Sequence, residues 1–359
     1  MNNLDKQYQA LLQDILDNGV KKQDRTGTGT ISVFGRQIRH KMSDGFPLLT
    51  TKKLHWKSIV GELLWFLKGS TDIRHLWKDN ISIWDGDWFK KYKNSCSSPY
   101  TLEEIKQKVK TGGHSFHDSM FNLGPIYGAG WRSIQYNGKI IDQIANAIHL
   151  LKTNPDDRGI IVSAWNVGEL DNMVLRPCHN FFQFFTRELS VKERLFFVNK
   201  SDDEYNKSLS NKEQYESIGL DFELALASRM NELNIPTRSI SLMYNARSQD
   251  VPLGTPFNIS SYGLLLEIIA KAVNMIPDEL IANMGDCHIY SNQIEPIKEQ
   301  LNREPFPLPT LNINTEFWKT ESGECGVGPL ATNLYDLEIS DFTIENYQSH
   351  PSIKIPLSN

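Results

Sequence analysis

The chain has 359 residues, of which 40% are hydrophobic and 23% are charged, and this balance is typical of a folded globular protein. Its formal net charge of -5 provides no general attraction to DNA, RNA or an anionic membrane surface. We therefore expect any anionic ligand to be held by individually placed arginines.

The N-terminal sequence MNNLDKQYQALLQDILDNG lacks the apolar region of a signal peptide, and no later stretch is long and apolar enough to span a bilayer. We expect a cytoplasmic protein. The four cysteines are Cys96, Cys178, Cys287 and Cys325, and no two of them show the CxxC spacing of a zinc or redox motif. The sequence therefore predicts reduced thiols and no metal site.

Apolar residues at helical spacing predict two helices in the first part of the chain. Residues 4–18 form an amphipathic pattern that ends at Gly19. A second helix is expected to begin at a cap formed by Ser58 and to end before Gly69. Glu62 lies inside this otherwise apolar second helix, and a carboxylate in such a place needs a specific reason.

Further along the chain, helical and extended patterns alternate without an internal repeat, and this predicts a mixed α/β (α+β) fold. Asn154-Pro155 is expected to end a helix because the residue before a proline disfavours helical geometry. The predicted elements are a helix through Ile140, Ile141, Ile144, Ile148 and Leu151, strands at 159–165, 178–185 and 239–246, and a helix at about 260–274 capped by Ser260 or Ser261.

Two segments differ in composition from the rest of the chain. Residues 89–121 are rich in Lys, Ser and Gly, and residues 187–237 are mostly charged. The second segment contains a helical pattern through Phe222, Leu226 and Met230 to Leu233. We interpret both as insertions into a single domain that spans 1–359, and we expect 89–121 to form ordinary surface loops.

The run LRPCHNFFQFF at 175–185 places Cys178 directly after a proline, at the start of an apolar strand. A single buried cysteine is usually inert packing, whereas the neighbouring His179 suggests a thiol hydrolase. Consecutive side chains on a strand point to opposite faces, so His179 is poorly placed as the base for Cys178.

The run ARSQDVPLGTPFNISSY at 246–262 gathers Arg247, Ser248, Asp250 and Asn258 in one strand–turn–helix passage. Arg247 and Ser248 can donate hydrogen bonds to a phosphate, and Asn258 offers both a donor and an acceptor to a base edge. A solvated polar turn is the alternative interpretation, and it is favoured for any one of these residues considered singly.

Two shorter runs also carry polar groups. DRTGTGT at 24–30 resembles a phosphate-binding loop but lacks the Walker spacing and a following GK[ST]. GDCHIYSN at 285–292 places His288 and Tyr290 on one face of an extended segment, which suits two hydrogen bonds to a sugar hydroxyl.

With FPLLTTKKLHWKSIVGELLWFLKGSTDI at 46–73, SIWD at 82–85, NLGPIYG at 122–128 and DDRGIIVSAWNVGEL at 156–170, these four runs closely resemble the thymidylate synthase family. The match follows the family's order across nearly the whole chain outside the two predicted insertions. The resemblance implies a mixed sheet packed with helices, with one sheet face forming the interface of a homodimer whose active sites are shared.

The resemblance also implies a methyltransferase that moves and reduces a one-carbon unit from 5,10-methylenetetrahydrofolate, a reduced folate that serves as co-substrate, to C5 of dUMP. The products would be dTMP and dihydrofolate. No metal, DNA or membrane partner is implied.

By this resemblance, Cys178 is the nucleophile that adds to C6 of uracil and makes C5 reactive. Glu62 assists proton transfer near O4 through ordered water, and Tyr127 assists the loss of the C5 proton. Asn258 recognises uracil, and Asp250 hydrogen-bonds the pterin. The other implied ligands are Arg25, Arg247, Ser248 and Arg158 of the partner subunit for phosphate, His288 and Tyr290 for ribose, and His55, Ile83, Trp84, Leu175, Leu253, Gly254 and Phe257 for the folate.

The phosphate site departs from the family pattern. Gly159 follows Arg158 where the family usually carries a second arginine, so one phosphate contact from the partner is missing. A charge-assisted hydrogen bond contributes about 1.5–3 kcal/mol, enough to weaken nucleotide binding. Arg176, two residues before Cys178, is the candidate replacement.

Three further departures concern the reacting ring and its seal against water. Asn245-Ala246 stands where the family usually has tyrosine and glutamine, and Ala129-Gly130 stands where it usually has lysine and glutamine. The chain ends in IPLSN, so Asn359 replaces the family's apolar C-terminal residue and is expected to seal the site less tightly.

These departures leave an alternative product open, because water that reaches the exocyclic methylene gives a hydroxymethyl group. The alternative is a deoxyuridylate hydroxymethyltransferase that produces 5-hydroxymethyl-dUMP, although Trp84 and Leu175 favour the methyl product. A hypothesis from another class is a catalytically retired nucleotide- or RNA-binding homologue. The joint presence of Cys178, Glu62, Tyr127 and Asn258 argues against it.

Overall fold

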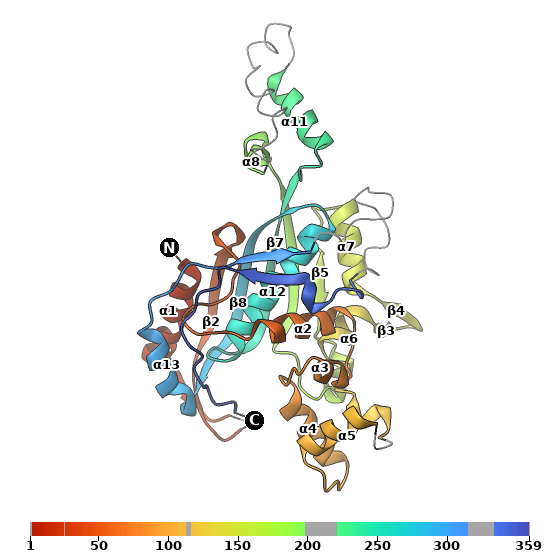
Figure 1. The fold of residues 1–359 in the computed structure, drawn as a ribbon, viewed down its shortest axis with the longest axis vertical. Coiled ribbons are helices and arrows are strands. Elements are labelled where there is room, and N and C mark those ends of the chain that lie inside the picture. The colour runs from red at the N-terminus through yellow and green to blue at the C-terminus, as the bar shows by residue number, and fades with distance from the viewer. Residues whose placement is uncertain (1, 25, 113–115, 198–220, 315–333, 359) are drawn as a thin grey trace.

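The structure is a computed structural model that describes residues 2–24, 26–112, 116–197, 221–314 and 334–358 (Figure 1). At its centre is a six-stranded sheet in the order β1-β2-β8-β7-β6-β5, in which β7 and β8 are parallel and the other neighbours are antiparallel. The predicted mixed sheet packed with helices is confirmed. The strands are β1 (Val20–Lys22), β2 (Thr30–Lys41), β5 (Ile161–Ser163), β6 (His179–Glu188), β7 (Arg238–Asp250) and β8 (Ile276–Tyr290), with the hairpins β3 (Ile134–Tyr136) with β4 (Lys139–Ile141) and β9 (Thr310–Ile313) with β10 (Phe342–Glu345).

Helices cover one face of this sheet. The long and mostly buried α12 (Gly254–Ala272) packs on β7 and β8, and α1 (Asn3–Asn18) packs on β2. The helix α2 (Trp56–Leu67) lies against α12 and carries Glu62. The other α-helices in the described residues are α3 (Arg74–Lys78), α4 (Asp85–Ser95), α5 (Leu102–Thr111), α6 (Tyr127–Arg132), α7 (Gln143–Thr153), α8 (Val191–Leu195), α11 (Phe222–Glu232) and α13 (Ile294–Leu301).

The opposite face of the sheet leaves apolar side chains exposed. On β6, Phe182 and Phe184 are buried, whereas Phe185 points the other way and is exposed. Phe34 on β2 and Ile161 on β5 are exposed as well. An apolar sheet face of this kind is typical of a surface that another chain covers.

The first predicted helix is confirmed, and its ends have clear physical causes. The side chain of Asn2 accepts a hydrogen bond from the backbone N–H of Asp5 and so caps the helix. Tyr8, Leu12 and Ile15 are buried. The helix ends at Asn18, and the N–H of Gly19 donates to the carbonyl of Ile15.

Both predicted serine caps are wrong. Ser58 lies within the first turn of α2, where its N–H donates to the carbonyl of His55 and its Oγ hydrogen-bonds Nδ1 of the same residue, 2.7 Å away. Ser260 lies inside α12, six residues after its start, and its Oγ donates to the carbonyls of Pro47 and Pro256. In both cases the helix begins earlier because tertiary packing extends it beyond the local capping signal.

The predicted helix through Ile140 and Ile141 begins too early. These two residues belong to β4, which is joined to β3 by a turn at Asn137 and Gly138, both with positive φ. This turn chemistry favours a hairpin, and it overrides the helical spacing of the isoleucines. The helix α7 then begins after Asp142, whose side chain caps it, and the following strand β5 is shorter than predicted.

The interpretation of 89–121 as ordinary surface loops is also wrong. The segment contains the end of α4 and all of α5, which begins with a capping box between Thr101 and Glu104. The buried ring of Trp88 stacks on Tyr92 and on Phe121, with centroids 5.2 and 5.8 Å away. Aromatic packing therefore joins this segment to the main hydrophobic core.

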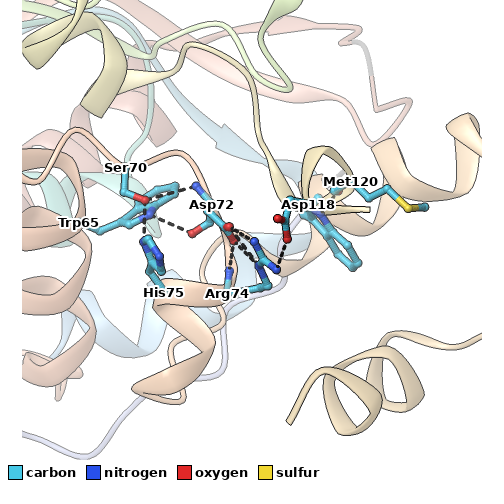
Figure 2. A network of polar contacts seen from close by, with 8 residues as sticks. Trp65, Ser70, Asp72, Arg74, His75, Asp118 and Met120 are labelled. Atoms are coloured by element: carbon cyan, nitrogen blue, oxygen red, sulfur yellow. Dashed lines mark hydrogen bonds and ion pairs between the residues drawn. The ribbon is translucent and has the colours of Figure 1, made fainter. Parts of the chain in front are cut away.

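A polar network fastens the turn after α2 to this segment, as Figure 2 shows. Arg74 donates from Nε to both carboxylate oxygens of Asp72 and from Nη1 to Asp118, 2.7 Å away. The indole N–H of Trp65 donates to the carbonyl of Asp72. These bonds fix the end of the helix that bears Glu62.

The segment 187–237 lies between the end of β6 and the start of β7, and its described helices α8 and α11 lie at that end of the molecule (Figure 1). The helix α11 confirms the helical pattern predicted from Phe222 onward. Leu226 and Met230 are buried in a small cluster separate from the main core. Within the described ranges, no helix has the length and apolar character needed to cross a membrane.

Candidate active site

Cys178 lies immediately before β6, and its backbone is held from two sides. Its N–H donates to Oη of Tyr127, 2.8 Å away, and its carbonyl accepts from the N–H of Arg247 at the same distance. Cys178 takes part in no disulfide and is only partly buried. The local geometry therefore presents a cysteine of fixed backbone that remains accessible.

The guanidinium of Arg247 lies against the segment that precedes Cys178. Its Nε donates to the carbonyl of Pro177 and its Nη2 to that of Arg176, at 2.9 and 3.0 Å. A positive charge in this place favours a thiolate over a thiol. Arg247 thus can serve both the nucleophile and an anionic ligand.

His179 belongs to the aromatic interior of the site. Its ring stacks on Tyr127 with centroids 4.1 Å apart, and its Nδ1 lies 2.8 Å from Oη of Tyr262. Burial lowers the pKa of His179 to about 3, so the imidazole is neutral. Since its hydrogen-bond partner is a tyrosine in the core, His179 positions Tyr262 and Tyr127 rather than Cys178.

Glu62 on α2 is half-buried and pairs with Trp84 at the start of α4. The indole Nε1 of Trp84 donates to Oε1 of Glu62, 2.8 Å away. Burial raises the pKa of Glu62 to about 7, although the bond from Trp84 opposes the shift. A carboxyl with this pKa can give or take a proton near neutral pH.

The carboxylate of Glu62 interacts electrostatically with Tyr127 and Tyr262. Burial is the main cause that raises the pKa of Tyr127 and Tyr262, and the carboxylate of Glu62 adds to both shifts. The thiolate of Cys178 also raises the pKa of Tyr127. The structure therefore brings Cys178, Tyr127 and Glu62 into one electrostatic unit from three separate segments.

The passage from β7 to α12 holds the next group of predicted residues. Asp250 accepts a hydrogen bond at Oδ1 from the N–H of Leu253 and another at Oδ2 from Nε2 of Gln293. Burial raises its pKa. Asn258 donates from Nδ2 to Oε1 of Gln249 over 3.4 Å, and Gly254 and Phe257 lie in the first turn of the same helix.

His288 and Tyr290 come from β8 and reach the same site through strand pairing. Asp250 is the β-partner of His288, and Ser248 is the partner of Asp286. The rings of His288 and Tyr290 lie 5.2 Å apart, as expected for alternate residues of one strand. The parallel pairing of β7 with β8 is what joins these two sequence runs.

A cavity of about 830 Å³ lies beside this cluster and is lined by Leu175, Arg176 and Arg247 together with Lys90 and Lys91. The two lysines come from α4. Sequence reasoning did not single them out, because nothing local to that segment indicates that it reaches the site. Their charges add to that of Arg247 and suit an anionic ligand.

Several residues predicted for the site lie away from Cys178 or form bonds with other side chains. Arg25 falls outside the described residues. Arg158 is exposed before β5 and is separated from β7 by β6. His55 hydrogen-bonds Ser58, and Ile83 is exposed at the start of the Trp84 segment. Arg176 donates to Asp171 in an exposed ion pair.

Sequence reasoning missed four buried groups. Gln249 and Tyr262 lie within the run at 246–262, and the inward side of β7 would have been the signal for Gln249. Gln293 follows Tyr290, and Lys52 donates to the carbonyl of Pro252, where burial lowers its pKa to about 8. In the described part of the chain, no group of three or more His, Cys, Asp or Glu residues could hold a metal ion.

Residues at the positions that depart from the family pattern form contacts of their own. Asn245 accepts a hydrogen bond from Nδ2 of Asn283 across β7 and β8, 2.6 Å away, and Ala246 is buried. The N–H of Gly159 donates to Asp157. A side chain at position 159 would have its Cβ 3.0 Å from that carboxylate oxygen, so an arginine there requires Asp157 to shift.

The chain was compared with models of known protein families. The family model described as thymidylate synthase matches residues 6–205 and 213–359 of the chain. Every residue of the candidate site lies within the matched ranges.

Proposed function

The chain belongs to the thymidylate synthase family, whose enzymes transfer a one-carbon unit to dUMP from methylenetetrahydrofolate as co-substrate, and we propose that it is itself a thymidylate synthase. In this proposal the one-carbon unit is transferred and reduced to a methyl group at C5. The products are dTMP and dihydrofolate.

The observation that carries the proposal is the position of Cys178 between Tyr127 and Arg247. Cys178 adds to C6 of uracil as the thiolate, which the charge of Arg247 favours. C5 then attacks the one-carbon unit and loses its proton with the help of Tyr127. The bond between the one-carbon unit and the folate nitrogen then breaks, which leaves a methylene on C5 and tetrahydrofolate as the leaving group. Hydride transfer from this tetrahydrofolate reduces the methylene to a methyl group as the bond between Sγ and C6 breaks, and this gives dTMP, dihydrofolate and the free thiolate.

Glu62 is the proton-transfer group of the proposal, acting near O4 through ordered water. Its pKa of about 7 supports this role, because both ionisation states are populated at neutral pH. Asn258 recognises the uracil edge. Arg25, Arg247 and Ser248 bind the phosphate together with Arg158 of the partner subunit, and His288 and Tyr290 bind the ribose.

For the folate, Asp250 binds the pterin, and Trp84 and Leu175 shape the surface on which the ring system lies. His55, Ile83, Leu253, Gly254 and Phe257 complete the pocket. The bond from Trp84 to Glu62 fixes the indole, and a fixed aromatic surface supports hydride transfer to the methylene.

The alternative product is 5-hydroxymethyl-dUMP, and one observation favours it. Ala246 is small and buried where the family usually has glutamine, so a polar group near the ring is lost. The decisive experiment is mass spectrometry of the products from dUMP and methylenetetrahydrofolate. Thymidylate with stoichiometric dihydrofolate supports the proposal, whereas hydroxymethyl-dUMP with tetrahydrofolate replaces it with the alternative.

A retired nucleotide- or RNA-binding homologue is tested separately, by release of tritium from C5-labelled dUMP. Only an active thiol addition makes C5 exchange that proton. An absence of release from purified protein that binds dUMP would favour the retired homologue.

The quaternary structure is part of the proposal. A single domain spanning 1–359, with insertions at 89–121 and 187–237, would pair with a second copy through the sheet face that exposes Phe34, Ile161 and Phe185. Each subunit would then lend Arg158 to the other's phosphate site. The proposal places this homodimer in the cytoplasm, without DNA, membrane or metal partners.

A further inference from the structure

The side-chain amide of Gln293 connects the candidate site with the C-terminal segment. Gln293 follows β8 and is fully buried. Its Nε2 donates to Oδ2 of Asp250 at 3.1 Å and to the carbonyl of Pro356 at 3.0 Å. Its Oε1 accepts from the backbone N–H of Tyr290 at 3.0 Å.

These three bonds define the orientation of the amide. A carboxamide has two N–H donors and one carbonyl acceptor, and here both donors and the acceptor are engaged. Rotating the amide by a half turn would set its oxygen against the carboxylate of Asp250 and its nitrogen against the N–H of Tyr290. Gln293 therefore has one favourable state.

The Gln293 amide supplies one of the two hydrogen bonds that hold the carboxylate of Asp250. The bond from Leu253 holds Oδ1, and the bond from Gln293 holds Oδ2. Asp250 is partly buried, and a carboxylate removed from water that loses a donor is costly to keep ionised. Removing the amide would thus change both the position and the charge of this carboxylate.

The end of the chain depends on the same amide. Residues up to Pro351 are fastened by several bonds, including Tyr347 to the carbonyl of Leu49 and Arg303 to that of Pro351. Beyond Pro351, the described residues show two bonds to this segment: Gln293 to Pro356, and a longer contact of 3.4 Å between Ser358 and Asn292.

We propose that Gln293 is a positioning residue that fixes the Asp250 carboxylate and fastens residues 352–358 beside it, so that a single amide couples the pterin-binding group to the end of the chain. The part of this inference that concerns pterin rests on the proposed role of Asp250. The fastening of the C-terminal segment stands on the contacts of Gln293 itself.

The test is Gln293→Met in the full-length protein, because methionine keeps the size of the side chain and removes its hydrogen bonds. Hydrogen exchange of the peptide covering 352–358 should become about tenfold faster. The Kd of methylenetetrahydrofolate in the presence of dUMP, measured in a Cys178→Ser background so that the mixture does not turn over, should rise by about tenfold or more. The Kd of dUMP should change less than that of the folate, since Gln293 holds only the backbone N–H of Tyr290 and not the side chains proposed to bind the nucleotide.

Gln300→Met is the matched control. Gln300 is equally buried and lies on α13. Among the described residues, its side-chain amide donates to Thr51 and its Oε1 has no hydrogen-bond partner, so the amide bonds no residue of the candidate site. This variant should leave both the exchange of 352–358 and the folate Kd unchanged. Gln293→Glu gives a second variant of the same length that keeps an acceptor for Tyr290 and faces Asp250 with a like charge, so its folate Kd should rise further as pH increases.

Unchanged exchange of 352–358 in folded Gln293→Met or Gln293→Glu would overturn the fastening. Faster exchange with an unaltered folate Kd would overturn the coupling. If the native protein bound no folate at all, the proposed function would fail, and the exchange comparison would still decide whether Gln293 holds the end of the chain.

Discussion

Trp84 donates a hydrogen bond from its indole Nε1 to Oε1 of Glu62, 2.8 Å away. Glu62 lies on α2 and Trp84 immediately precedes α4, and their bond joins the aromatic surface proposed for the folate to the carboxyl proposed for proton transfer. Because burial raises the pKa of Glu62 to about 7, this contact is connected to measurable pH dependence.

The first prediction concerns stability. The pKa of Glu62 lies near 7 in the folded protein against an ordinary value of 4.5, so between these values the folded state holds a proton that the unfolded state has released. The free energy of unfolding should therefore decrease as pH rises from about 4.5 to about 7, and level off above. Urea unfolding of Glu62→Gln should lack this component, so its stability relative to the native protein should increase across that range. Parallel pH curves for the two proteins would contradict the assignment.

The second prediction concerns the reaction. Glu62→Gln should lower kcat by about 10²-fold or more, because the amide cannot transfer a proton. The pH profile of kcat/KM should also lose an ionisation near pH 7. The control is Glu267→Gln, since burial also raises the pKa of Glu267 to about 7 on α12. If both variants kept the same profile as the native enzyme, Glu62 would not be the ionising group.

The third prediction is that Cys178→Ser abolishes both turnover and tritium release from C5-labelled dUMP, because only the thiolate activates C5. Cys96→Ser is the control, because Cys96 is a free, partly buried cysteine outside the site. Cys287 is not a competing nucleophile, since burial raises its pKa to about 12. Substantial tritium release by purified Cys178→Ser would defeat the mechanism.

The fourth prediction tests the shared site. Mixing inactive Cys178→Ala with inactive Arg158→Ala should restore activity, because one site of each mixed dimer combines an intact Cys178 with an intact Arg158 from the partner. Random exchange would restore up to about a quarter of the sites. Subunit exchange shown by native mass spectrometry without any recovered activity would mean that Arg158 does not act across the interface.

The fifth prediction is base choice. Asn258 donates one of its N–H groups to Gln249, which leaves Oδ1 for the N3–H of uracil and the second N–H for O4. Cytosine presents the reverse pattern, and a buried mismatch costs about 1–3 kcal/mol per unsatisfied group. We expect strong preference for dUMP over dCMP in the native enzyme and a shift toward dCMP in Asn258→Asp. Competition assays decide the matter, and equal kcat/KM for both nucleotides in the native enzyme would exclude Asn258 as the selector.

Local sequence determined those elements whose stability is local. The helix at 4–18 and the helical pattern from Phe222 were predictable because apolar spacing and capping residues lie within a few positions of each other. The runs around Cys178 and Asn258 indicated the candidate site and the family, because residue types and order survive in the sequence without knowledge of the fold.

Tertiary structure decided the features that depend on distant neighbours. Ser58 and Ser260 look like caps locally, yet packing extends both helices beyond them. The helices within 89–121 are stabilised by the aromatic stack around Trp88, which the local sequence did not indicate.

The parallel pairing of β7 with β8 brings Asp250 beside His288, and the buried amide of Gln293 reaches both Asp250 and Pro356. His288 lies 38 residues after Asp250, and Gln293 and Pro356 lie still further along the chain. Such contacts form only when the whole core closes, because burial and strand register are set by long-range packing, and no local pattern records which distant residue will supply the missing hydrogen bond.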